Sequence, residues 1–156
     1  MVNFTSPDGL HACYLGSETP PGALICRNGK IPAVLWIVGE GDRSAVVLSE
    51  TAAARPWQTF PLAAPGNWFG YHIGAVELEV DRDSAVVQEN GLRNLGDIYV
   101  TAGGLYIVTS GDGYAQQQNL KIGPATSYHH RGLLRFPSWR LIQSRPAGAM
   151  EVIFSR

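Results

Sequence analysis

Long apolar runs are absent from this sequence of 156 residues, and the longest uninterrupted one, residues 33–38, has only six. A helix that crosses a bilayer needs roughly 20 apolar residues. The first residues also lack the basic and apolar regions of a secretory signal. These absences predict a soluble protein of the cytoplasm with no membrane partner, while export by another route stays open.

Cysteine is scarce, since Cys13 and Cys26 are the only two. Two cysteines do not make a disulfide framework, although a hairpin through residues 19–22 would bring them opposite each other. Without a secretory signal we expect free thiols. His11 shares a strand face with Cys13 and His72 is a further possible neighbour, but the closely spaced ligand pairs of structural zinc sites are missing. We therefore expect no metal and no cofactor.

Charged residues make up only 16% of the chain, while 45% of the residues are hydrophobic, a balance that excludes general disorder. The chain is long enough to bury well over half of its unfolded surface in one core. No internal repeat is evident, and the stretches rich in proline or glycine are short enough to be turns. We expect a single domain over residues 1–156.

Helical signals are nearly absent, because short apolar or alternating runs are separated by Gly, Pro, Asn or Asp at nearly regular spacing. This pattern is typical of an antiparallel all-β domain. The predicted fold is a single antiparallel β-barrel or a two-sheet β-sandwich, with short helical turns at residues 50–55 and 90–95. The predicted strands cover residues 11–15, 23–27, 33–38, 44–49, 57–62, 69–80, 84–88, 97–101, 105–109, 114–122, 133–143 and 149–154.

The clearest local unit is a hairpin over residues 97–109. If Gly103 and Gly104 form a two-residue turn, Val100 pairs with Ile107. Alternation then divides the side chains between a core face and a mixed face. The core face carries Ile98, Val100, Leu105 and Ile107, and the mixed face carries Tyr99, Thr101, Tyr106 and Val108.

The charges nearly cancel overall but are sorted along the chain. Residues 69–112 carry seven acids against two bases, and residues 121–156 carry six bases against one acid. Alternation places Glu77, Glu79 and Asp81 on the outward face of one strand. We expect a late basic strand to lie beside that strand and to neutralise it, and the alternative is a homo-oligomer in which the two charged regions belong to different copies.

Motifs of the common enzyme classes are missing: there is no Gly-x-Ser-x-Gly sequence and no complete phosphate loop. Two carboxylates of the acidic strand would suit an inverting glycosidase only across a cleft, so a solvated face is the better interpretation. His129 and His130 are weak candidates for the base of a small hydrolase or isomerase. Neighbouring residues in a strand point to opposite faces, so at most one of the two would serve a given pocket. An enzyme is the less favoured hypothesis.

Aromatic residues crowd the stretch from Trp57 to Tyr71, where prolines interrupt the strands. Such rings either plug one end of a core or line the mouth of a barrel. The leading hypothesis is a non-enzymatic binding module that holds a small-molecule or protein ligand at this mouth or on a sheet face. The predicted ligand-binding residues are Trp57, Trp68, Tyr71, Tyr99 and Tyr106.

The basic end of the chain mixes arginines with rings, which is how some β-barrels hold single-stranded nucleic acid. Arg131, Arg135 and Arg140 would contact the phosphates in this alternative. The slightly negative net charge makes it less favoured than a small-molecule or protein ligand.

Overall fold

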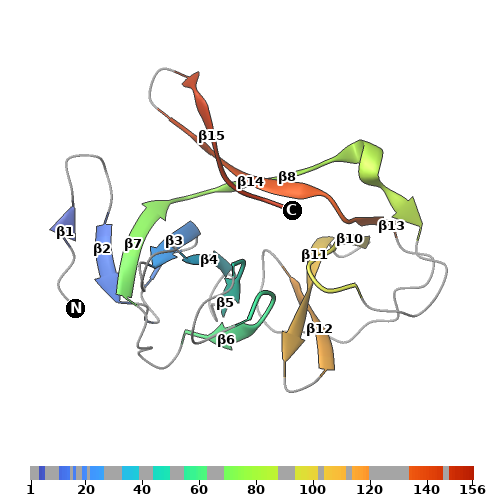
Figure 1. Cartoon of the computed structure of the whole chain (residues 1–156), viewed down its shortest axis with the longest axis horizontal. Coiled ribbons are helices and arrows are strands. Elements are labelled where there is room, and N and C mark those ends of the chain that lie inside the picture. The colour runs from blue at the N-terminus through green and yellow to red at the C-terminus, as the bar shows by residue number, and fades with distance from the viewer. Residues whose placement is uncertain are drawn as a thin grey trace. The chain divides into compact units, whose positions relative to one another are not determined.

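The computed structural model (Figure 1) describes residues 4–5, 11–14, 16, 19–20, 22–26, 33–38, 44–49, 55–62, 69–87, 94–101, 104–111, 114–119, 134–145 and 148–156. The chain divides into two compact units, Met1–Ala75 and Val76–Arg156, called here the N-terminal and the C-terminal unit. Each is described by itself, and the expectation of a single domain stays a prediction. The described part of the chain contains no helix long and apolar enough to cross a membrane.

The N-terminal unit is one antiparallel sheet with the strand order β1-β2-β7-β3-β4-β5-β6. Its strands are β1 (Phe4–Thr5), β2 (His11–Tyr14), β3 (Gly22–Cys26), β4 (Ala33–Val38), β5 (Ser44–Val47), β6 (Thr59–Pro61) and β7 (Phe69–Gly74). Strands β4 and β5 are apolar almost throughout and buried along most of their length, as expected where both faces of a sheet are covered. They supply most of the buried side chains described in this unit.

Strand β7 separates the two cysteines. Cys13 in β2 and Cys26 in β3 both lie opposite Gly70 in β7, one on each side. Their Cα atoms are therefore about two strand spacings apart, roughly 10 Å. A disulfide spans at most about 7 Å between Cα atoms. The hairpin that would have brought the cysteines opposite each other is thus wrong, because β7 inserts between β2 and β3.

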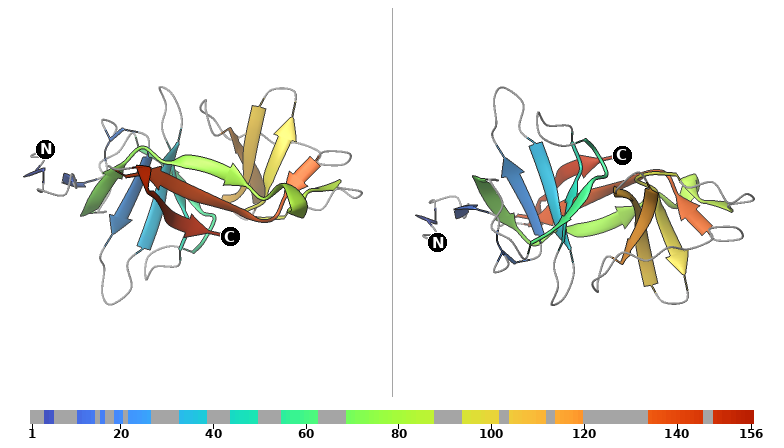
Figure 2. Two further views of the ribbon diagram at one scale, coloured as in Figure 1. Left: turned by 90° about the horizontal axis from the view of Figure 1, so that it is seen from above. Right: turned by 90° about the horizontal axis from the view of Figure 1, so that it is seen from below.

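The C-terminal unit contains a five-stranded sheet with the order β12-β11-β10-β13-β9 and a three-stranded sheet with the order β15-β14-β8. Its elements are β8 (Glu77–Val80), the 3₁₀ turn η1 (Arg82–Ser84), β9 (Val86–Val87), β10 (Ile98–Thr101), β11 (Gly104–Gly111), β12 (Tyr114–Asn119), β13 (Leu134–Phe136), β14 (Trp139–Ser144) and β15 (Met150–Ser155). Figure 2 shows the green strand β8 alongside the red strands β14 and β15.

The core of the C-terminal unit contains Ile98, Ile107 and Phe136, which face one another across three paired strands. Trp139 is buried and its indole Nε1 donates a 2.7 Å hydrogen bond to the carbonyl of Gly96. This bond ties the start of β14 to the turn before β10, because a buried indole N–H needs an acceptor.

The all-β prediction is confirmed, since most of the described residues lie in strands and η1 is a single short 3₁₀ turn. The strand pairings of these residues do not close any of the three sheets into a barrel. Most of the two predicted helical turns lies outside the described residues, whereas η1 was not predicted. The predicted strands 69–80 and 133–143 are each two strands, because the backbone leaves the ladder at Gly74–Ala75 and at Pro137.

The predicted register of the hairpin is wrong. Gly104 pairs with Thr101, and Val100 pairs with Leu105 rather than with Ile107. The observed partner of Val100 is two residues earlier in the chain than the predicted one. Because side chains alternate with a period of two, the predicted division of side chains between the two faces is unchanged. The observed register places Ile98 opposite Ile107 and Tyr99 opposite Tyr106, and all four are buried. Packing of these cross-strand pairs outweighs the turn preference of two glycines.

Candidate functional site

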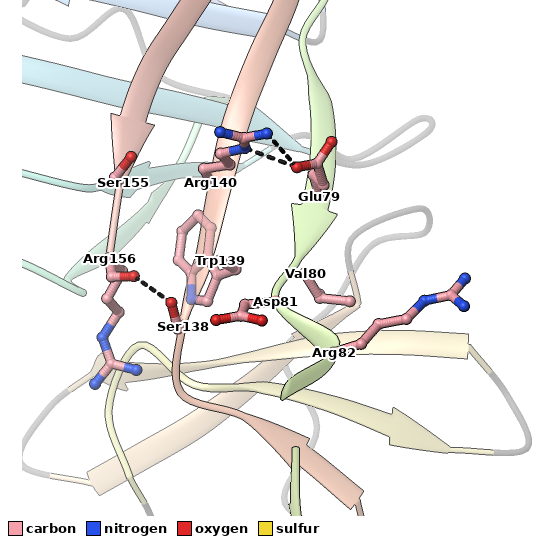
Figure 3. Close-up of a pocket in the computed structure, with 9 residues that line it drawn as sticks. All are labelled: Glu79, Val80, Asp81, Arg82, Ser138, Trp139, Arg140, Ser155 and Arg156. Carbon is pink, nitrogen blue, oxygen red and sulfur yellow. Dashed lines mark hydrogen bonds and ion pairs between the residues drawn. The ribbon is translucent and has the colours of Figure 1, made fainter. Parts of the chain in front are cut away.

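A polar pocket of about 380 Å³ lies within the C-terminal unit (Figure 3). Strands β8, β14 and β15 supply most of its lining, together with the residues that flank them. The lining residues are Glu79, Val80, Asp81, Arg82, Ser138, Trp139, Arg140, Ser155 and Arg156. The antiparallel register explains why they meet, since Arg140 lies directly opposite Glu79 on one side and Ser155 on the other.

One wall of the pocket is an ion pair between adjacent strands. The Glu79 Oε1 atom accepts a 2.7 Å hydrogen bond from Arg140 Nε, and Arg140 Nη2 lies 2.5 Å from the same oxygen. Both side chains are about half exposed, so the pair adds little to stability but cancels its own charge. The expected neutralisation of the acidic strand by a late basic strand is confirmed at this pair.

Asp81 joins the pocket to the turn that follows β8. Its backbone N–H donates to the carbonyl of Ser138 at 3.0 Å, which extends the pairing of β8 and β14. Its Oδ1 atom accepts a 3.0 Å hydrogen bond from the backbone N–H of Asp83 and so caps η1. Figure 3 shows the Asp81 carboxylate near Ser138, while the side chain of Arg82 leads away from the other lining residues.

Ser138 and Ser155 add hydroxyl groups to the pocket. The Ser138 hydroxyl donates a 3.2 Å hydrogen bond to the backbone carbonyl of Arg156. Ser155 lies beside Arg140 in the ladder and is exposed. The pocket therefore combines carboxylate, guanidinium and hydroxyl groups on closely paired strands, and can offer a ligand both hydrogen-bond donors and acceptors.

A buried carboxylate supports the pocket from within the unit. Asp97 is only 1% exposed, and its Oδ2 atom accepts a 2.7 Å hydrogen bond from Arg135 Nη1. Its Oδ1 atom accepts from Arg156 Nη1. The Arg156 guanidinium also donates to the carbonyls of Leu95 at 2.8 Å and Pro137 at 3.0 Å. The guanidinium is thus held by three acceptors, and these contacts keep the backbone of Arg156 beside Ser138.

The predicted sheet-face residues Tyr99 and Tyr106 are neighbours in the five-stranded sheet, but they are buried, with 0% and 7% exposure. Asn94 Nδ2 donates a 3.3 Å hydrogen bond to the Tyr99 hydroxyl. Burial raises the pKa of Tyr99 above its usual 10.0, although the hydrogen bond from Asn94 lowers it. The two rings lie inside the C-terminal unit, and their assignment to a ligand stays a prediction.

The predicted aromatic mouth falls in the N-terminal unit. Trp57 precedes β6 and is half-buried, with a φ of 70° that is rare for a bulky residue. Its backbone N–H donates to the carbonyl of Val47 at 2.7 Å. Tyr71 is half-buried in β7, which is separated from β6 by three strands in the sheet order. Trp68 lies outside the described residues.

Of the other predicted site residues, two form ion pairs and three lie outside the described part of the chain. Arg135 and Arg140 bind Asp97 and Glu79, respectively. Arg131, His129 and His130 lie outside the described residues. The nucleic-acid and histidine-dependent hypotheses therefore stay predictions.

The described side chains contain no group of three His, Cys, Asp or Glu residues that could hold a metal. The buried His72 uses both ring nitrogens, since Nδ1 accepts from the backbone N–H of Gly74 at 3.0 Å and Nε2 lies 3.0 Å from the carbonyl of Pro20. This geometry defines the neutral tautomer with its proton on Nε2.

Sequence reasoning pointed to Glu79, Asp81 and Arg140 but did not identify Ser138, Ser155 and Arg156. Alternation alone places Ser138 on the same strand face as Arg140. Ser138 could have been added to the predicted site from the expected pairing of the acidic strand with the late basic strand. Neither the role of Arg156 nor the burial of Asp97 carries a local signal, because both depend on contacts between distant segments.

The fold and the pocket together define a strand-rich protein with an open polar pocket on a three-stranded sheet. A family model described as "Uncharacterised protein y4lG" matches residues 16–154, and the chain belongs to this Y4lG family. No curated protein and no solved structure shows a significant match to the chain.

Proposed function

We propose that this protein is a non-enzymatic binding module and that the pocket between β8, β14 and β15 holds a small polar ligand. The observation that supports this most directly is the convergence of carboxylate, guanidinium and hydroxyl groups around a volume of about 380 Å³. Pockets for small molecules usually measure about 300–1,000 Å³ and carry a few polar groups that fix the ligand's orientation.

Binding is favoured over catalysis because the ionisable groups of the pocket already have structural partners. Glu79 is held by Arg140, and the Asp81 carboxylate caps η1. A general acid or base must be placed where it can exchange a proton with the substrate. Groups fixed by neighbouring strands are better suited to orienting a ligand, and the function proposed here needs no cofactor.

A ligand panel tests this proposal. Sugars, amino acids and polyols are added to the isotope-labelled protein, and amide chemical shifts are followed by NMR. We expect at least one compound to shift the amides of Asp81, Ser138 and Ser155 together, because these residues line one pocket. Shifts confined to other parts of the chain would reject the pocket as the ligand site.

A pair of variants in β15 gives the matched control. Ser155→Phe places a large ring at the pocket wall, whereas Val152→Phe adds a ring at an exposed position of the same strand that does not line the pocket. We expect the first change to abolish the ligand-induced shifts and the second to preserve them. Equal effects of the two changes would contradict the proposed location.

A further inference from the structure

We propose that the ligand of this pocket presents a positively charged group, an ammonium or a guanidinium, to the carboxylate of Asp81. The inference rests on the proposed function and names the chemical class of the ligand. It follows from which charged side chains around the pocket have an ion-pair partner and which do not.

Two of the three arginines that line the pocket are already held by other groups of the protein. Arg140 is bound side-on by Glu79, so this pair offers a ligand little net charge. The guanidinium of Arg156 is held by Asp97, which it shares with Arg135, and by the backbone carbonyls of Leu95 and Pro137. The side chain of Arg82 leads away from the other residues in Figure 3. Among the described lining residues, no arginine therefore directs an unpaired guanidinium group toward the pocket.

The carboxylate of Asp81, in contrast, is bound by a neutral group. Its Oδ1 atom accepts a hydrogen bond from the neutral backbone N–H of Asp83, which leaves the negative charge of the carboxylate in place. Within the described residues no arginine or lysine forms an ion pair with Asp81. Figure 3 shows this carboxylate near Ser138, on the pocket side of the strand, where a ligand's cationic group would meet it.

The rest of the pocket suits the polar remainder of such a ligand. Arg140 Nη1 makes no hydrogen bond to the described residues and can donate to a hydroxyl or ether oxygen. Ser155 stands directly opposite Arg140 and can donate or accept. A hydrogen bond between an ammonium and a carboxylate is stronger than one between neutral groups. The geometry therefore favours a hydroxylated amine over an uncharged or acidic compound of the same size.

Three probes that share one sugar ring test this preference: glucosamine, glucose and glucuronate. They present an ammonium, a neutral hydroxyl and a carboxylate, respectively, and are titrated at slightly acidic pH so that the amine is protonated. Because Asp81 is exposed to solvent, we expect glucosamine to bind only about threefold to fivefold more tightly than glucose. Glucuronate should bind most weakly. The readout is the shift of the amides of Asp81, Ser138 and Ser155.

Two variants isolate the carboxylate. Asp81→Asn keeps the capping oxygen of η1, because asparagine caps helical turns about as well as aspartate, but removes the charge. Asp83→Asn removes another exposed charge, two residues away, that does not line the pocket. We expect the preference for glucosamine over glucose to disappear in the first variant and to persist in the second.

The outcomes separate this inference from the function on which it rests. If glucose or glucuronate shifts the pocket amides as strongly as glucosamine, the pocket binds ligands but the cationic preference is wrong. Persistence of the preference in Asp81→Asn also overturns the assignment to Asp81. If none of the three probes shifts the pocket amides but another compound of the panel does, the inference is rejected and the proposed pocket stands. If no compound of the panel shifts them, both are rejected.

Discussion

Asp97 shows how one side chain organises the C-terminal unit. Its carboxylate is buried between two arginines that come from β13 and from the residue that follows β15. Removing one partner of a buried ion pair is costly, because it leaves the other charge without compensation. The same arginine, Arg156, positions the backbone carbonyl that receives the hydrogen bond from Ser138. The stability of this cluster and the shape of the pocket are therefore linked.

We expect Asp97→Asn to lower the free energy of unfolding by about 2–4 kcal/mol, since it leaves Arg135 and Arg156 without the carboxylate charge that they share. Urea denaturation monitored by tryptophan fluorescence measures the loss. The exposed Asp83 provides the control, and Asp83→Asn should change stability by less than about 0.5 kcal/mol. A similar small change in both variants would show that the buried carboxylate contributes nothing specific.

The buried phenol of Tyr99 should make the stability of the fold depend on pH in the alkaline range. Burial raises the pKa of its phenol in the folded state above the usual 10.0, so folding favours the neutral form. The stability contributed by this effect is present below about pH 10 and is lost as the pH rises through the folded-state pKa. Between about pH 8 and about pH 11, the free energy of unfolding should therefore decrease less in Tyr99→Phe than in the wild type.

The comparison of Tyr99→Phe with the wild type is made by urea denaturation at several pH values. The chain has six tyrosines, so Tyr106→Phe serves as the control for titration of the others. Parallel pH profiles for Tyr99→Phe and the wild type would contradict the assignment of the effect to Tyr99.

For single residues, the sequence predicted which side chains of a strand share a face, but it did not predict which charged side chains are buried. Glu77, Glu79 and Asp81 are exposed, as alternation predicted. Asp97 has the same chemistry but lies in the interior, because two distant arginines meet it there. Sequence alone favours exposure for any aspartate, and only the tertiary contacts reverse that preference.

Among the elements, β3 and β7 approach each other closely at a pair of glycines, Gly22 and Gly74. Gly22 has a φ of +143°, and a Cβ atom built there would lie 2.2 Å from the carbonyl oxygen of Gly74. Real Cβ atoms do not come this close to a backbone oxygen, so any side chain would force the two strands apart. This contact explains why the start of β3 requires glycine.

Gly22→Ala should therefore destabilise the protein by more than about 2 kcal/mol, because both the backbone conformation and the close contact are lost. Gly148→Ala is the matched control: Gly148 also has a positive φ, of +79°, but a Cβ atom there would meet nothing within 4 Å. The control should cost only about 1 kcal/mol from backbone strain. Thermal unfolding measures both, and equal losses would show that the contact with Gly74 is unimportant.

The strands themselves were largely predictable, whereas most of the pairings between distant strands were not. The run from Ala33 to Val38 forms β4 with the predicted bounds, because six apolar residues between turn signals leave few alternatives. The insertion of β7 between β2 and β3 had no local signal. Pairings between distant strands depend on packing of the whole sheet, which periodicity does not report.

For the whole molecule, the charge sorting acquires a simple explanation. The acidic middle and the basic end of the sequence belong mainly to the C-terminal unit, which carries eight acidic and eight basic side chains in all. Ion pairs of Glu79 with Arg140 and of Glu151 with Arg145 join its neighbouring strands. The charges that look separated along the chain are therefore balanced within one unit, and they do not require a second copy.

The strand pairings lead to the same view of the C-terminal unit. Every described pairing of its eight strands joins two strands of that unit, and the buried ion pairs of Asp97 also lie within it. A segment whose described strand pairings and buried ion pairs all lie within it meets the physical requirements of an independent domain. We expect a fragment of residues 76–156 to fold alone and to keep the amide chemical shifts that its core residues have in the full chain.

The comparison of NMR spectra of the fragment and the full chain measures this directly. A shorter fragment of residues 81–156 is the control, because it lacks β8 and so exposes one edge of β14 while retaining the Asp97 cluster. It should unfold at a lower urea concentration than the longer fragment. If residues 76–156 give the collapsed spectrum of an unfolded chain, the two units fold only together, and the single domain expected from the sequence would be the correct description.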